Sequence, residues 1–169
     1  MMLDLTPFCS IDPDRPDLHK PTSHGNWTYA TTNHVLLRVP RRDDVPENTK
    51  AEDCAAKFTS YITGTEVYTP LSCGPLPVST KITCDVCSGY KNRFHDCPSC
   101  KCKCTKCDEH GQIEQSLSID IAGVPFDVKY IALLQTLPGI RIATPQPGTP
   151  MLFQFDGGDG MLMPLKWPR

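Results

Sequence analysis

Seven of the ten cysteines in this 169-residue chain lie in one short stretch, from Cys84 to Cys107. They form three C-x-x-C pairs and one additional cysteine, in the order Cys84/Cys87, Cys97/Cys100, Cys102 and Cys104/Cys107. Each C-x-x-C pair can wrap two thiolates around one metal ion, and two pairs make the closed tetrahedral site of a structural zinc. The sequence therefore predicts a small module that folds around one or two Zn²⁺ ions rather than around an apolar core.

The cysteine spacing leaves two ways of sharing these ions open. In the first, the outer pairs Cys84/Cys87 and Cys104/Cys107 hold one ion, and Cys97, Cys100 and Cys102 hold the second with His95 or His110 as the fourth ligand. In the second, Cys84/Cys87 join Cys97/Cys100, and Cys102, Cys104 and Cys107 join His110. We prefer the outer pairing, although spacing alone does not decide between the two.

Other uses of clustered cysteines are less favoured. Residues Met1 to Ser10 include Asp4 and Pro7 and lack a basic segment, so we expect no secretory signal and a reducing, cytoplasmic setting. Such a setting disfavours disulfides, while an iron–sulfur cluster uses the same thiolates and is the other alternative. A closed Cys₄ site leaves no open position for water, so we expect no metal catalysis there.

The cysteine-rich stretch interrupts a longer domain. We assign residues 1–80 and 112–169 to one α+β domain and residues 81–111 to an inserted zinc module, whose six Lys/Arg outnumber its four acids. In the first segment, Asn26 to Thr31 and His34 to Val39 are predicted strands joined by a Thr32-Asn33 turn. Short helices are predicted over Leu3 to Ser10 and over Ala51 to Ile62.

The last segment has the clearer pattern. Alternating Ile113, Leu117, Ile119 and Ile121 predict one strand, and Asp127 is the expected N-cap of a helix over residues 128–137. Strands are then predicted over residues 139–143, 151–155 and 161–165, with residues 156–160 as a hairpin turn. The resulting order is β-α-β-β-β.

Two resemblances follow from these motifs. Cys84-x-x-Cys87-x-Gly89 and Cys97-Pro-x-Cys100 resemble the zinc repeats of DnaJ-type co-chaperones, over about 25 residues. The flanking segments resemble the bacterial sliding clamp, the DNA polymerase III beta subunit, over about 90 residues. There, Tyr29 to Leu36 is similar to an Ala-Thr-Asp-Gly-His-Arg-Leu hairpin, and Met161-Leu-Met-Pro-Leu-Lys166 is similar to the closing strand.

The clamp resemblance implies a DNA-clamp-like domain with two βαβββ-type halves and helices on one face of a sheet. It also implies a cleft for partner peptides bordered by Met163, Pro164 and Leu165. Members of that family carry three such domains per subunit, so one domain encircles DNA only as a homo-oligomer. A short clamp-like chain with its own insertion fits a phage or prophage gene.

We therefore expect a non-enzymatic, cytoplasmic binding protein that acts in DNA replication or DNA metabolism. Its expected partners are replication proteins and, through basic side chains, DNA. The candidate DNA contacts are Lys91, Arg93, Lys101, Lys103, Lys106 and Lys129. The alternative is a stand-alone zinc-dependent interaction module with no clamp role. No nucleotide-binding, zinc-protease or nucleophile motif is present, so an enzyme is the least favoured reading.

Overall fold

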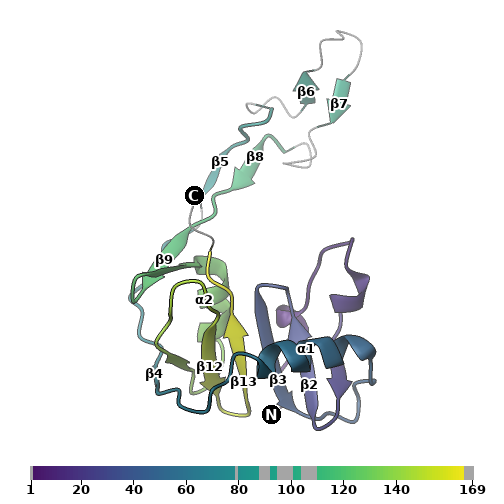
Figure 1. Cartoon of the computed structure of the whole chain (residues 1–169). Coiled ribbons are helices and arrows are strands. Elements are labelled where there is room, and N and C mark those ends of the chain that lie inside the picture. Colours follow the sequence, from purple (N-terminus) through teal and green to yellow (C-terminus); the bar gives the residue numbers. More distant parts are fainter. Residues whose placement is uncertain (1, 79, 88–91, 95–100, 104–109, 166–169) are drawn as a thin grey trace. The chain divides into compact units, whose positions relative to one another are not determined.

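The computed structural model of the chain describes residues 2–78, 80–87, 92–94, 101–103 and 110–165 (Figure 1). The chain divides into two compact units, which are described separately below. One consists of Met1–Leu76 with Ser118–Arg169, and the other is Pro77–Leu117. The second unit therefore contains the predicted module, residues 81–111, and extends beyond it at both ends.

The first unit is built on one antiparallel sheet of seven strands. From one edge to the other its strands are β1 (Thr22–His24), β2 (Trp27–Thr31), β3 (Val35–Pro40), β13 (Gly158–Leu162), β12 (Met151–Phe155), β11 (Arg141–Ala143) and β4 (Tyr68–Pro70). The C-terminal strand β13 pairs with β3, so the sheet joins the two ends of the chain. This is an α+β fold, as expected.

The two α-helices of the described chain pack on opposite faces of this sheet (Figure 1). Helix α1 (Thr49–Thr59) contributes Ala51 and Phe58 to one core, which includes Leu36 of β3. Helix α2 (Val128–Gln135) contributes Ile131 and Leu134 to the other core, which includes the neighbouring residues Val35 and Leu37. The expectation of helices on one face is therefore wrong for α1 and α2. The strand β3 is apolar on both faces, so each face must be covered.

The α2 side of the sheet carries additional elements. They are the 3₁₀ turn η1 (Thr6–Phe8) and the hairpin of β9 (Ser118–Ile121) with β10 (Val124–Asp127), whose apolar side chains join the α2 core. A second 3₁₀ turn, η2 (Pro16–Leu18), lies in the loop before β1.

Several local predictions are confirmed. Asn33 has a positive φ of 73° in the β2–β3 turn, as expected for an asparagine in a tight turn. Asp127 is the N-cap of α2, since its Oδ1 accepts the Lys129 backbone N–H at 2.9 Å. The predicted helix over 51–62 is α1. The predicted helix over 3–10 is reduced to η1, because Pro7 lacks the N–H that a continuing helix needs.

Two predicted strands are wrong in their bounds. The alternation from Ile113 to Ile121 belongs to two strands, since β8 (Gln112–Glu114) lies in the second unit and β9 in the first. The last hairpin turn is Asp156-Gly157 alone, and β13 begins at Gly158 rather than at residue 161. Period-2 alternation cannot reveal which partner each strand pairs with.

The glycines of β13 are required by the aromatic residues of β12. Gly160 is the cross-strand partner of Phe153, and Gly158 is that of Phe155. A Cβ on Gly160 would overlap the Phe153 ring, and a Cβ on Gly158 would overlap the Phe155 ring. Each aromatic ring therefore packs directly over the glycine opposite it. The close packing of these rings, rather than the geometry of a turn, explains why Gly158 and Gly160 are glycines.

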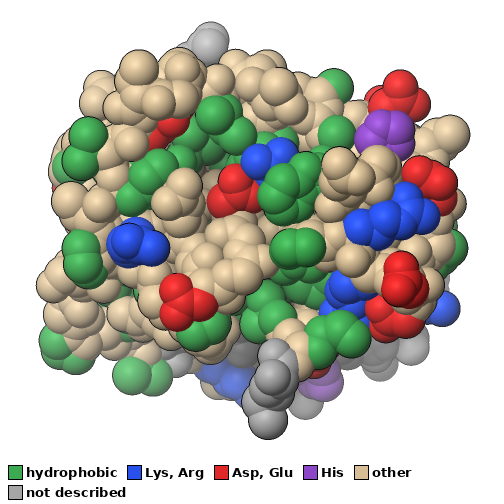
Figure 2. Space-filling view, turned by 90° about the horizontal axis from the view of Figure 1, so that it is seen from below, with side chains coloured by type: hydrophobic (Ala, Val, Ile, Leu, Met, Phe, Trp, Pro, Cys, Tyr) green, Lys and Arg blue, Asp and Glu red, His purple; other side chains and the backbone are tan. Residues whose placement is uncertain are grey.

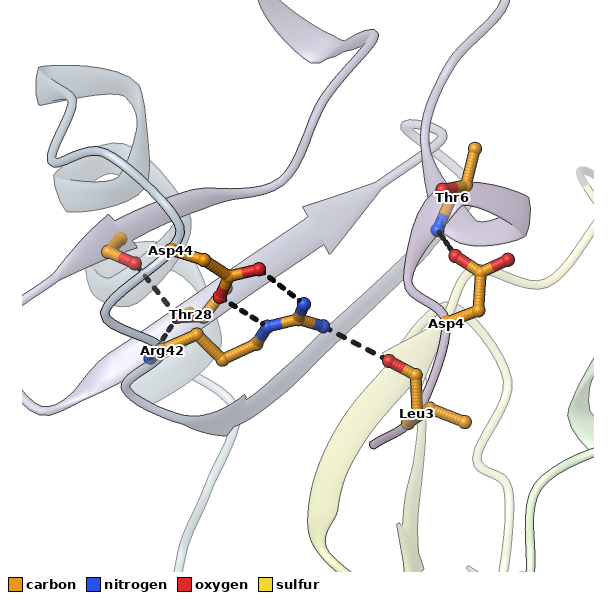
Figure 3. A network of polar contacts seen from close by, with 7 residues as sticks. Leu3, Asp4, Thr6, Thr28, Arg42 and Asp44 are labelled. Carbon is orange, nitrogen blue, oxygen red and sulfur yellow. Dashed lines mark hydrogen bonds and ion pairs between the residues drawn. The ribbon is translucent and has the colours of Figure 1, made fainter. Parts of the chain in front are cut away.

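An arginine anchors the N-terminal segment to the sheet (Figure 3). Arg42 forms a two-pronged ion pair with Asp44 at 3.0 and 2.8 Å, and its Nη1 donates to the Leu3 carbonyl at 3.1 Å. The Arg42 backbone N–H donates to Thr28 Oγ1 at 2.9 Å. This network holds the chain before η1 beside the loop that follows β3.

The second unit contains two short antiparallel ladders. One joins β5 (Lys81–Thr83) to β8, and the other joins β6 (Asn92–Phe94) to β7 (Lys101–Lys103). Strands β6 and β7 lie between β5 and β8 in the sequence. The segment that follows β5 and the segment that precedes β8 therefore start from the same end of the β5–β8 ladder.

Candidate metal centre and surface cavities

The pair Cys84/Cys87 follows β5 directly and occupies a turn. Cys84 is 0% exposed and Cys87 is 2% exposed, and the half-buried Ile113 packs against them. Neither thiol forms a disulfide. Three aliphatic side chains of the same unit, Val78, Ile82 and Val86, are 84%, 41% and 39% exposed. Among the described residues of this unit, cysteine thiols are therefore buried where a small domain ordinarily buries aliphatic carbon.

The ladder between β5 and β8 fixes what lies beside this pair. The Cys84 backbone N–H donates to the Gly111 carbonyl at 3.0 Å, which continues the register Thr83↔Gln112. Gly111 has a positive φ of 73° and is buried. Cys84 therefore lies against the segment that enters β8.

Most of the other predicted ligands lie outside the described residues. They are His95, Cys97, Cys100, Cys104 and Cys107, while for Cys102 only the backbone position in β7, paired with Arg93, is described. His110 is described and is exposed. Among the described residues, no group of three or more His, Cys, Asp or Glu side chains is arranged to hold a metal ion.

The remaining three cysteines lie in the first unit. Cys9 is buried, and its Sγ donates to the Leu5 carbonyl at 3.6 Å. Burial raises the pKa of the Cys9 thiol to about 11, which keeps it protonated and unreactive. Cys54 and Cys73 are half-buried. These three cysteines are distributed through the domain and need no metal to explain them.

One of the three predicted cleft residues lines a cavity. Met163 borders a hollow of about 210 Å³ together with Leu36 and Met161 from the sheet and Lys57 from α1. Pro164 and Leu165 do not line it, and the Leu165 N–H donates instead to the Pro125 carbonyl at 2.9 Å. The chain turns away from this cavity after Met163, so Met163 alone of the three residues borders it, and the peptide cleft stays a prediction.

The predicted DNA-contacting side chains are not brought together in the described structure. Lys91 and Lys106 lie outside the described residues, and Arg93, Lys101 and Lys103 are described only as backbone positions in β6 and β7. Lys129 is exposed on α2, where its Nζ lies 4.6 Å from the centre of the Tyr130 ring.

The most elaborate polar cluster was not predicted from the sequence. The Arg38 side chain forms two hydrogen bonds to Asp159, at 2.7 and 2.9 Å. Its guanidinium lies between the rings of Trp27 and Phe58, at 4.2 and 4.3 Å from their centres. Burial alone would lower the pKa of Arg38, but hydrogen bonds to Asp159 and Tyr29 outweigh it and raise the pKa. Arg38 and Asp159 are 121 residues apart, so no local sequence signal relates them.

Comparisons with known proteins match no family, no curated protein and no solved structure. Within the described residues, no helix has the length and apolar character needed to cross a membrane.

Proposed function

We propose that this chain is a non-catalytic binding protein whose cysteine-rich unit is held in shape by Zn²⁺. The observation that carries the proposal is the reversed burial around Cys84 and Cys87, which are inside while Val78 and Ile82 are exposed. A thiolate buried as Cys84 and Cys87 are is stable only if a cation compensates its charge. A structural zinc would supply that charge and, with it, folding free energy for this unit.

The strand pairing favours the outer pairing of the cysteines. Cys84 is hydrogen-bonded to Gly111, and Gly111 is only four positions after Cys107, the end of the last C-x-x-C pair, a span of at most about 14 Å. Cys97 and Cys100 belong instead to the connection between the paired strands β6 and β7. We therefore propose that Cys84/Cys87 and Cys104/Cys107 share one ion, and that Cys97, Cys100 and Cys102 hold the second with a histidine.

Metal content is the direct test. Mass spectrometry of the purified full-length protein is expected to find one or two zinc ions per chain, and Cys84→Ser to remove one of them. Cys73→Ser is the matched control, since Cys73 belongs to the first unit and should leave the zinc content unchanged. Iron in place of zinc, or full content in Cys84→Ser, would refute the proposal.

The ligand pairing needs a second measurement. In cadmium-substituted protein, heteronuclear NMR correlates each metal ion with the cysteines that bind it. A shared ion for Cys84 and Cys104 supports the outer pairing. A shared ion for Cys84 and Cys97 would exclude it and leave the zinc proposal standing.

A clamp-like role in DNA replication is the second candidate. The Met163 cavity favours it, because one of the three residues that the resemblance assigns to a peptide cleft borders a hollow. The opposite-face packing of α1 and α2 weighs against a ring, since the resemblance implies helices on one face. Light scattering after size-exclusion chromatography separates the two, because encirclement of DNA requires an oligomer and the zinc-module proposal does not.

A further inference from the structure

A row of polar side chains crosses the α1 face of the sheet beside the area that α1 covers. Arg141, Gln154, Asp159 and Arg38 are consecutive cross-strand partners from β11 to β3. Two residues further along the strands, the corresponding row is apolar and belongs to the α1 core, with Ala143, Leu152, Met161 and Leu36. The sheet thus changes on one face from an apolar strip under the helix to a polar strip beside it.

The polar strip is hollowed. A cavity of about 260 Å³ is lined by Trp27 and Pro40 on one side, by Arg141 and Gln154 on the other, and by the backbone of Gly157 and Gly158 with Asp159 between them. Gly157 adds no side chain to this floor, whereas a side chain on Gly158 would meet the Phe155 ring instead. Figure 2 shows one face of the molecule, on which basic and acidic side chains lie among hydrophobic ones.

The charges in the hollow do not cancel. Both carboxylate oxygens of Asp159 are engaged by Arg38, so its negative charge is already compensated. Arg141 is exposed, and no carboxylate of the described chain lies within ion-pairing distance of it. Its guanidinium and the Gln154 amide therefore offer donors to an incoming anion, while Trp27 and Pro40 offer flat apolar surface.

We propose that this hollow binds a small planar organic anion, with the ring against Trp27 and Pro40 and the carboxylate or phosphate on Arg141. The volume suits one ring with one anionic group rather than a larger cofactor. The site lies wholly in the first unit and does not depend on the zinc proposal.

NMR titration of the full chain tests the site. The probes are adenosine monophosphate, benzoate, adenosine and inorganic phosphate, and the reporter is the Trp27 indole N–H, assigned with Trp167→Phe. We expect a saturable shift with adenosine monophosphate or benzoate, which also tells a phosphate from a carboxylate ligand. We expect adenosine and phosphate to bind about tenfold more weakly or not at all, because each lacks half of the recognition.

Variants locate the binding. Arg141→Gln should lower the affinity for the anion by about tenfold. Arg141→Lys keeps the positive charge but loses the two-pronged hydrogen bonding of a guanidinium, so it should lower the affinity by less. Lys57→Gln is the control, a cation on α1 that lines a different cavity. The proposal is overturned if no probe gives a saturable shift below about 10 mM, if phosphate alone binds as tightly as the ring-bearing anions, or if Arg141→Gln binds them unchanged.

Discussion

The ion pair between Arg38 and Asp159 is expected to be a main determinant of the stability of the first unit. The side chains are only 16% and 22% exposed, and two aromatic rings cover the guanidinium. Asp159→Asn keeps the shape of the side chain but removes its charge, which leaves Arg38 desolvated and without a counter-ion. The raised pKa of Arg38 means that it cannot escape this cost by losing its proton.

The magnitude follows from the burial. Breaking a fully buried pair by removing one partner costs about 3–5 kcal/mol, whereas an exposed pair contributes about 0–1 kcal/mol. With about four fifths of each side chain buried, we expect Asp159→Asn to lower the free energy of unfolding by about 2–3 kcal/mol. For a unit of about 130 residues this lowers Tm by about 8–12 °C.

Urea and thermal unfolding, followed by far-UV circular dichroism, measure this loss. Glu47→Gln is the control, because both partners of its ion pair with Arg41 are exposed, at 39% for Arg41 and 58% for Glu47, so little stability should be lost. Replacing both partners by apolar residues, with Arg38→Met and Asp159→Leu, should restore much of the stability. A loss no greater in Asp159→Asn than in Glu47→Gln would refute the reasoning.

Two further predictions concern the interior of the first unit. Gly160→Ala should destabilise it by about 1–3 kcal/mol, because the new methyl group overlaps the Phe153 ring and the Leu36 carbonyl. Gly74→Ala is the control and should be neutral, because its methyl group meets nothing within 4 Å. Equal urea midpoints for the two variants would contradict this prediction. Cys9 should resist iodoacetamide in the folded protein at pH 8, where its thiol is protonated. Because its pKa is raised from 9.0 to about 11, the unfolded chain loses this proton first, so stability should fall as the pH rises from 9 to 11. Cys9→Ala should remove that part of the pH dependence, and rapid labelling of Cys9 at pH 8 would show that the burial argument is wrong.

Local signals in the sequence were sufficient for much of the first unit. Asp127 predicted the start of α2, and Asn33 predicted the β2–β3 turn, because each depends on hydrogen bonds or backbone angles within a few residues. The cysteine spacing predicted a metal module from equally local signals, and that module stays a prediction.

What the sequence by itself determined, then, was local: the α+β class, the cap of α2 at Asp127 and the turn at Asn33, while the zinc ligands stay a prediction. Only the tertiary structure decided that β13 pairs with β3, that the two α-helices cover opposite faces, and that Ile113 and Ile119 belong to different units. It also brought Arg38 to Asp159 and set Arg141 beside Gln154. The physical reason is that caps and turns are satisfied by near neighbours, whereas strand partners and buried charges are chosen by burial across the whole domain, which no short window of sequence contains.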